Sequence, residues 1–202
     1  MFITLEGPEG AGKSTLARKL AERLREAGWE AVLTREPGEG DFGQRVREIL
    51  LHGDEMVAQA ELFLFLADRS QHVRGFIEPA LARGACVLCD RYADSTLVYQ
   101  HYSRGLDGDF VRAANAFATG GLAPDLTLLL DLPAEVGLAR LQGKDRLDSA
   151  PLDFHRRVRE GFLAEAREGG RWRVLDAGES PESVEKAAWE SVETFLRGRA
   201  VV

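Results

Sequence analysis

The sequence predicts an α/β fold in three layers, with a five-stranded parallel sheet between two layers of helices. Apolar runs of about five residues recur along the chain, and a helical pattern follows each run, as is typical of parallel βαβ units. The 202 residues, 45% of them hydrophobic, can bury one substantial core, and no linker-like composition divides them. We therefore expect one domain that spans residues 1–202.

The expected strands are the apolar runs themselves. They cover Phe2–Leu5, Ala31–Thr34, Ala85–Cys89, Leu126–Leu130 and Arg173–Leu175. In an open parallel sheet, ligands bind outside the carboxyl ends of the strands. The residues that follow each run are therefore the first candidates for a functional site.

The expected helices carry apolar residues at helical spacing. Leu16, Leu20 and Leu24 trace one face of the first helix, and Gly28 is suited to its C-terminal end. Further helices are expected at Asp41–Leu51, Val57–Val73, Asp109–Ala118 and Leu152–Glu168. The last helix is expected to begin after Ser180, because Ser-Pro-Glu supplies an N-cap, a proline at N1 and an acidic first turn.

A phosphate-binding motif follows the first strand. It matches G-x-x-x-x-G-K-[ST] and comprises Gly7, Pro8, Glu9, Gly10, Ala11, Gly12, Lys13, Ser14 and Thr15. Its glycines let backbone N–H groups converge on phosphate, Lys13 can reach the β- and γ-phosphates, and Ser14 can ligate Mg²⁺. The alternative is an ordinary glycine-rich turn, but the strand before it and the helix after it favour nucleotide binding and a P-loop fold.

Charged residues follow the second and third strands. Arg35 comes after the second, and Asp90 and Arg91 come after the third. P-loop proteins place a carboxylate that holds Mg²⁺ at a strand end of this kind, and Arg91 can reach phosphate. The alternative for Asp90 is a simple salt bridge at the strand end.

Phe65 and Arg69 lie four residues apart and share a helical face. Most aromatic residues on such a face belong to the core. A ring that stacks on a base and a guanidinium that bonds its edge would use the same spacing. The stretch Asp94–Tyr102 concentrates hydroxyl, amide and phenol groups and is either a polar loop or part of this site.

Residues 140–157 are expected to include a mobile, basic lid, with Arg140, Lys144 and Arg146 exposed. A solvated loop is the usual meaning of such a run. The variable positions of the phosphate-binding motif hold no arginine, however, and a phosphoryl-transfer enzyme needs cations that arrive when both substrates are bound. The lid is the nearest source of such cations.

Composition excludes several classes of function. A net charge of −7 argues against a protein that coats nucleic acid or an anionic membrane. With no apolar signal segment and no long apolar span, a cytoplasmic location is expected. Cys86 and Cys89 should face opposite sides of a strand as buried, reduced thiols, and the histidines show no metal-binding spacing.

Six stretches together resemble the bacterial thymidylate kinases, and the resemblance runs along nearly the whole chain. They are FITLEGPEGAGKST at the start, TREPG at 34–38, FLADR at 65–69, DRYADSTLVYQ at 90–100, PDLTLLLDLP at 124–133 and FHRRVREGF at 154–162. The resemblance implies a P-loop kinase fold, a homodimer, and transfer of phosphate from ATP to dTMP with Mg²⁺ as cofactor.

The resemblance also implies roles on the phosphate side. Lys13, and Ser14 with Asp90 through Mg²⁺, would hold the ATP phosphates. Arg35 and Arg91 would clamp the phosphate of dTMP.

On the nucleoside side, Glu9 would face the 3′-hydroxyl and Tyr99 would press against the sugar. Phe65 would stack on thymine and Arg69 would bond its O4. Ser95 and Thr96 would also bind the substrate, Thr96 near the N3 edge.

For the catalytic arginine of the lid, the resemblance points first to Arg146, then to Arg140 and Arg157. Glu36 is expected to orient an arginine instead of touching the nucleotide.

Two other readings compete with a dTMP kinase. The first is another nucleoside monophosphate kinase or a nucleoside kinase, which would share the phosphate-binding motif and the lid. The second belongs to a different class, a P-loop nucleotide switch whose output is binding to a protein partner. Such a switch would have no use for Arg35, Phe65, Arg69 and Tyr99.

Overall fold

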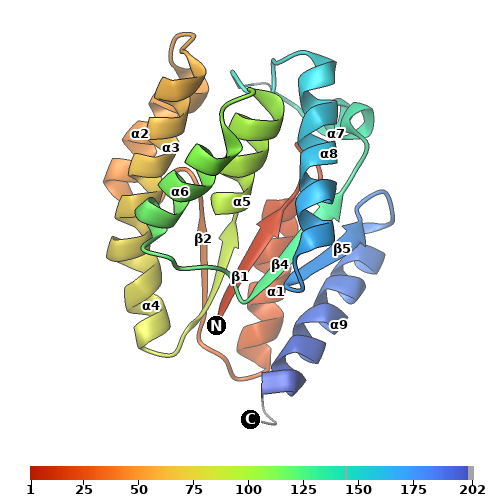
Figure 1. Ribbon diagram of the computed structural model, residues 1–202. Helices are drawn as coiled ribbons and strands as arrows, with labels where there is room; N and C mark the ends of the chain where they lie inside the picture. The colour runs from red at the N-terminus through yellow and green to blue at the C-terminus, as the bar shows by residue number, and fades with distance from the viewer. Residues whose placement is uncertain (144, 200–202) are drawn as a thin grey trace.

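Five parallel strands form one sheet in a computed structural model of the protein, which describes residues 1–143 and 145–199 (Figure 1). The strands are β1 (Phe2–Glu6), β2 (Ala31–Arg35), β3 (Cys86–Asp90), β4 (Leu126–Asp131) and β5 (Trp172–Asp176). Their order is β2-β3-β1-β4-β5, and every neighbouring pair is parallel. The predicted sheet is confirmed, with each boundary within one residue of its expected place.

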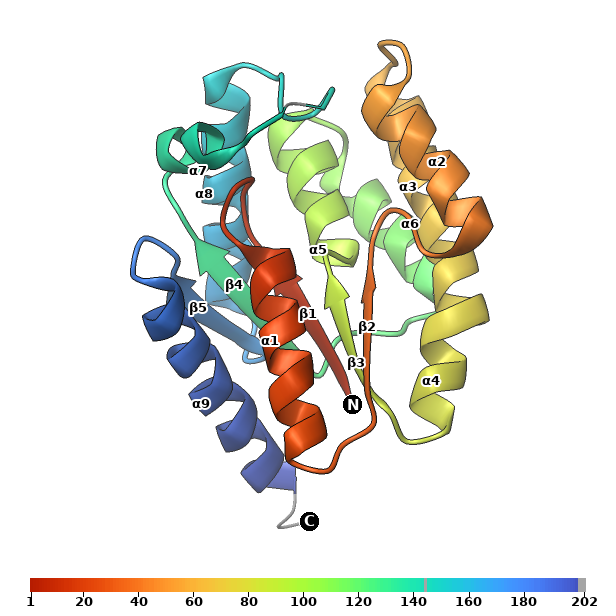
Figure 2. The same ribbon diagram turned by 180° about the vertical axis from the view of Figure 1, so that it is seen from behind.

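Helices cover both faces of this sheet. One face packs against α1 (Lys13–Glu26) and α9 (Pro181–Arg199), which lie in front in Figure 2. The other face packs against a long helical stretch made of α3 (Ala58–His72), η1 (Val73–Ile77) and α4 (Glu78–Ala82), and against α8 (Leu152–Glu168). The remaining helices are α2 (Gly40–His52), α5 (Ala93–Thr96), η2 (Leu97–Ser103), α6 (Gly108–Thr119) and α7 (Ala134–Arg140).

The helix ends follow the expected local chemistry. α1 ends just before Gly28, which has a φ of 88°. At the start of α9, the Ser180 hydroxyl oxygen accepts a hydrogen bond from the backbone N–H of Ser183 at 3.2 Å, as an N-cap does. These contacts satisfy backbone groups that the helices themselves leave without partners.

The stretch 94–102 is not a polar loop. α5 is followed directly by η2, a π-helical segment, and Leu97, Val98, Tyr99 and Gln100 are buried in it. The sequence suggested a loop because its hydroxyl and amide groups obscured the apolar residues between them. The structure uses the wider π turn to bury both kinds of side chain.

The central strand β3 carries both cysteines as buried free thiols. Cys86 packs into the core under α1 and α9, whereas Cys89 packs into the core under η1 and α4. Burial raises the pKa of Cys86 to about 12 and raises that of Cys89 well above its usual value. The expectation of two separate, unreactive thiols is confirmed.

No helix within residues 1–143 and 145–199 combines the length and the apolar surface that a bilayer crossing demands.

Candidate functional site

The phosphate-binding motif forms the loop between β1 and α1. Gly7, Gly10 and Gly12 have φ values of 142°, 69° and 90°, which residues with a Cβ rarely adopt. The Lys13 ammonium donates hydrogen bonds to the carbonyl oxygens of Gly7 at 3.0 Å and Pro8 at 2.7 Å. Burial is the main cause that lowers the pKa of Lys13 to about 8. An arriving phosphate would therefore meet a cation that has already lost most of its water.

This loop is pressed against α7. A Cβ built on Gly10 would lie 2.1 Å from the carbonyl oxygen of Gly137, and a Cβ on Gly137 would lie 2.1 Å from the carbonyl oxygen of Glu9. Cβ atoms do not approach backbone oxygens this closely, so loop and helix can touch only if both residues are glycine. The sequence did not single out Gly137, because its contact partner is more than a hundred residues away.

Ser14 and Asp90 meet at the carboxyl ends of β1 and β3. The Ser14 hydroxyl donates a short hydrogen bond to Oδ2 of Asp90. Together they present one hydroxyl and one carboxylate oxygen beside Lys13, ligands that suit Mg²⁺ when phosphates and water supply the rest. Among the described residues, no group of three or more His, Cys, Asp and Glu side chains could hold a metal without such help.

Arg91 occupies a strained position at the end of β3. Its φ of 68° is in the left-handed region, which costs a residue with a Cβ roughly 1–2 kcal/mol. The Arg91 guanidinium forms an ion pair with Glu9 at 2.7 Å, and the Tyr99 hydroxyl donates to the other oxygen of Glu9. Although burial acts to raise the pKa of Glu9, the charges of Arg91 and Lys13 hold it down at about 2. Glu9 therefore stays ionised.

The buried carboxylate of Glu6 supports this arrangement from below. It accepts hydrogen bonds from the backbone N–H of Tyr92 at 2.9 Å and from the Ser95 hydroxyl at 2.6 Å. Ser95 in turn accepts a hydrogen bond from Arg91 at 3.1 Å. Burial and the charge of Asp94 raise the pKa of Glu6 to about 8. An acidic residue that ends an otherwise apolar strand was the available signal, and the sequence analysis did not use it.

Arg69 lies in a buried polar network. Its Nε donates to Glu36 at 2.8 Å, and its Nη1 donates to Thr96 at 2.8 Å and to Asn115 at 2.6 Å. The expectation that Glu36 orients an arginine is confirmed. His72 holds the second oxygen of Glu36 at 2.8 Å. Four partners thus fix the direction of the Arg69 guanidinium before any ligand binds.

One cavity of about 310 Å³ brings most of the predicted residues together. The predicted residues that line it are Glu9, Gly10, Gly12, Lys13, Ser14, Thr15, Arg35, Phe65, Arg69, Asp90, Arg91, Ser95, Thr96 and Tyr99. A second cavity of about 420 Å³ lies on the other side of the phosphate-binding loop and includes Ala11 and Arg140. Gly10, Gly12 and Thr15 line both, so the loop separates two adjoining sites.

Two polar residues on the wall of the first cavity were missed by the sequence analysis. Arg47, on α2, lies in the first cavity, where burial and the positive charge of Arg35 lower its pKa. Gln100, in η2, donates from Nε2 to Glu61 at 2.9 Å, while its Oε1 is buried with no hydrogen-bond partner in the described part of the chain. Both residues stand in stretches whose helical pattern alone gave no sign of a site.

The arginines of the predicted lid do not gather at the phosphate-binding loop. The guanidinium of Arg146 donates to Glu61 at 2.6 Å and to the carbonyl oxygen of Leu50 at 2.8 Å, and its side chain is only 14% exposed. The expectation of an exposed Arg146 is therefore wrong, because a buried carboxylate recruits it. Arg140 donates to the carbonyl oxygen of Ala177 at 3.1 Å beside the second cavity. Lys144 lies outside the described residues.

Arg157 donates to the carbonyl oxygen of Ser103 at 3.5 Å. It contacts η2 in this way and does not line either cavity.

Comparison with known proteins agrees with this geometry. A thymidylate kinase from Synechococcus is 54% identical over 197 residues, covering 97% of this chain and 96% of that protein. One from Thermomicrobium roseum is 53% identical over 204 residues, covering 98% and 97%. The crystal structure of thymidylate kinase from Ehrlichia chaffeensis has a TM-score of 0.74 and 34% identity, covering 87% of this chain and 91% of that one. The family profile described as thymidylate kinase matches residues 5–188, and the chain belongs to the thymidylate kinase family.

Proposed function

We propose that this protein transfers the γ-phosphoryl group of ATP to dTMP and so forms dTDP and ADP. The observation that carries the proposal is the cavity of about 310 Å³, in which Lys13 of the phosphate-binding loop faces Arg35, Phe65 and Arg69. A cationic cradle for one nucleotide and a ring-and-arginine pair for another share one space. This arrangement serves transfer between two nucleotides and not hydrolysis of one.

The base side of this cavity suits a pyrimidine imide. Phe65 is half-buried and offers a ring for stacking, and Arg69 offers a fixed guanidinium to a carbonyl oxygen such as O4 of thymine. The buried Oε1 of Gln100 lacks a partner in the described residues and can accept the imide N3–H. Thr96 stands beside Arg69 near the same edge of the base.

The sugar of dTMP is assigned to Tyr99 and Glu9, which are joined by a hydrogen bond. Glu9 would accept from the 3′-hydroxyl because its low pKa keeps it ionised. Tyr99 fills the space beside it, where a ribonucleotide would carry a 2′-hydroxyl.

The phosphates meet at the loop between the two cavities. Lys13 and the backbone N–H groups of residues 7–15 hold the phosphates of ATP, whose nucleoside extends into the second cavity beside Arg140. Ser14 and Asp90 would hold Mg²⁺, which neutralises charge on the β- and γ-phosphates when it is bound. Arg35 and Arg91, with Ser95 between Arg91 and Glu6, clamp the phosphate of dTMP.

The transfer needs no general base. A phosphate oxygen of dTMP is already an anion, so catalysis consists of bringing two polyanions into line and stabilising the charge between them. Residues 140–157 act as the lid that excludes water. Arg140 can supply a cation from the donor side, whereas Arg146 would first have to leave Glu61.

A coupled assay of ADP release tests the function. With MgATP present, dTMP is expected to give turnover well above that of dGMP or UMP, and ATP hydrolysis without an acceptor is expected to be low. Product identification by chromatography should show dTDP. Preference for a purine nucleotide would contradict the roles of Phe65 and Arg69, and nucleotide-dependent binding to a protein without dTDP formation would favour the switch.

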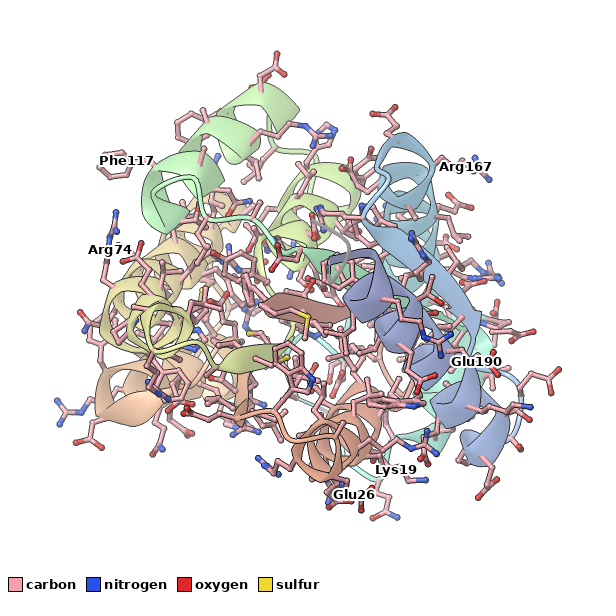
Figure 3. All side chains as sticks on the ribbon, turned by 90° about the horizontal axis from the view of Figure 1, so that it is seen from below. Lys19, Glu26, Arg74, Phe117, Arg167 and Glu190 are labelled. Atoms are coloured by element: carbon pink, nitrogen blue, oxygen red, sulfur yellow. The ribbon has the colours of Figure 1, made fainter. Side chains whose placement is uncertain are left out.

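We further propose that the protein is a cytoplasmic homodimer. Phe63 on α3 and Phe110 and Phe117 on α6 are 57%, 52% and 92% exposed, and α3 packs against α6. Figure 3 shows Phe117 pointing away from the protein at the rim of α6. Exposed aromatic side chains on adjoining helices are typical of an interface. The two free thiols fit a reducing compartment.

Sedimentation equilibrium tests the dimer. The wild-type protein is expected to sediment as a dimer at micromolar concentration, and Phe117→Asp is expected to shift the equilibrium towards monomer, because a charge would be buried in the interface. A wild-type protein that remains monomeric throughout this range would contradict the proposal.

A further inference from the structure

Glu61 is a buried carboxylate at the start of α3 that binds three side chains from other elements. Its Oε1 accepts from Gln100 at 2.9 Å and from Nε of Arg104 at 3.2 Å. Its Oε2 accepts from Nη2 of Arg104 at 3.2 Å and from Arg146 of the lid region at 2.6 Å. The side chain of Glu61 is 1% exposed. The two guanidinium groups compensate the burial of its charge.

This contact fixes the orientation of the Gln100 amide. A carboxylate with donors on both oxygens can only accept, so the amide nitrogen of Gln100 must face Glu61 and the amide oxygen must point the other way. That oxygen is the buried atom without a partner in the described chain, and Gln100 lines the cavity that we assign to dTMP. The wall of the cavity therefore offers an acceptor there and not a donor.

We propose that Glu61 is a positioning residue that sets the pyrimidine specificity of the kinase. By locking the Gln100 amide with its oxygen towards the cavity, it favours thymine and uracil, whose N3 carries a hydrogen. Cytosine presents an unprotonated N3 at the same place, and two acceptors would face each other. This inference rests on the proposed function, because it assigns the base of the acceptor nucleotide to this wall.

The same contact gives Arg146 a role different from the one expected from the sequence. Arg146 and Arg104 place positive charge at Oε2 of Glu61, so that this oxygen is the more strongly bound of the two. Arg146 thereby ties the 140–157 region to the residue that orients Gln100. Arg146 is a support of base recognition in this arrangement.

Glu61→Gln tests the inference. The oxygen of the new amide should take the Oε2 position between the two arginines, which leaves its NH₂ group facing Gln100. Gln100 would then turn over and present its own NH₂ group to the cavity. The ratio of kcat/KM for dCMP to that for dUMP is expected to rise about tenfold, the effect of one hydrogen bond. The ratio of dUMP to dTMP should not change, because both bases carry the N3 hydrogen.

Three further variants make the test specific. Glu61→Ala removes the acceptor without adding a donor and is expected to raise the dCMP to dUMP ratio even if Glu61→Gln folds poorly. Glu61→Asp keeps a carboxylate and is expected to retain most of the wild-type discrimination. Glu165→Gln is the matched control, because Glu165 also accepts from an arginine and a side-chain hydroxyl, those of Arg112 and Tyr102, but does not line the cavity.

A double-mutant cycle shows whether Glu61 acts through Gln100. In a Gln100→Ala background, Glu61→Gln is expected to leave the dCMP to dUMP ratio unchanged. The inference is overturned if folded Glu61→Gln and Glu61→Ala keep the wild-type ratio, if Glu165→Gln changes it equally, or if the effect persists without Gln100. Failure of the wild-type protein to phosphorylate dTMP would instead overturn the proposed function.

Discussion

Lys13→Ala is expected to lower kcat for the phosphorylation of dTMP by on the order of 10³-fold or more. The ammonium group is buried in the phosphate-binding loop, where the Gly7 and Pro8 carbonyls hold it close to the cavity. Charge that develops on the transferred phosphoryl group would lose its nearest protein cation. The KM for dTMP should change much less, since Arg35 and Arg91 remain on the acceptor side.

Steady-state kinetics of purified protein would measure both constants. Lys186→Ala is the matched control, because Lys186 on α9 pairs only with the exposed Glu190 and lies outside both cavities. Near-normal turnover by Lys13→Ala, with its fold intact by circular dichroism, would remove the mechanism proposed here.

Gly137→Ala is expected to be destabilising and to reduce kcat/KM on the order of 10²-fold, although alanine is the better helix former. Replacing glycine by alanine inside a helix ordinarily stabilises it by about 1 kcal/mol. At Gly137 the added Cβ would lie 2.1 Å from the carbonyl oxygen of Glu9. Either α7 or the phosphate-binding loop must then shift, and a displacement of about 1 Å can cost a rate factor of this size.

Gly198→Ala, near the end of α9, is the control, because a Cβ there would have no neighbour within 4 Å. It should leave activity unchanged and leave stability equal or slightly higher. Thermal unfolding and dTMP kinetics of both variants would separate the two effects. If Gly137→Ala were as active as wild type and more stable, close contact between α7 and the loop would not be required for function.

The sheet and most helices could be predicted because each is specified by a local pattern. Apolar runs bounded by turn residues located every strand, and helical spacing located α2, α6 and α8 almost to the residue. The π-helical segments η1 and η2 were not predicted. A π turn differs from an α turn by one hydrogen-bond register, and this choice depends on packing against neighbouring elements.

The site was predictable where one short motif holds all the chemistry. The loop 7–15 and the residues at the ends of β2 and β3 fall into this class, and most of them line one cavity. Arg146 fell outside it, because its position is set by Glu61, which lies 85 residues away in the sequence. Glu6 and Gln100 were missed for the same reason, since a hydrogen bond to a distant partner leaves no periodic trace.

The wide turn of η2 also fixes the length of the chain at this point. Tyr99 and Gln100 reach the cavity together with Thr96, which precedes the π-helical segment. Removing one residue would return the segment to ordinary α-helical winding and rotate everything that follows by about 100°. The stretch can therefore accept new side chains over evolutionary time but not a deletion, because a shortened chain would turn its sugar- and base-facing groups into the core.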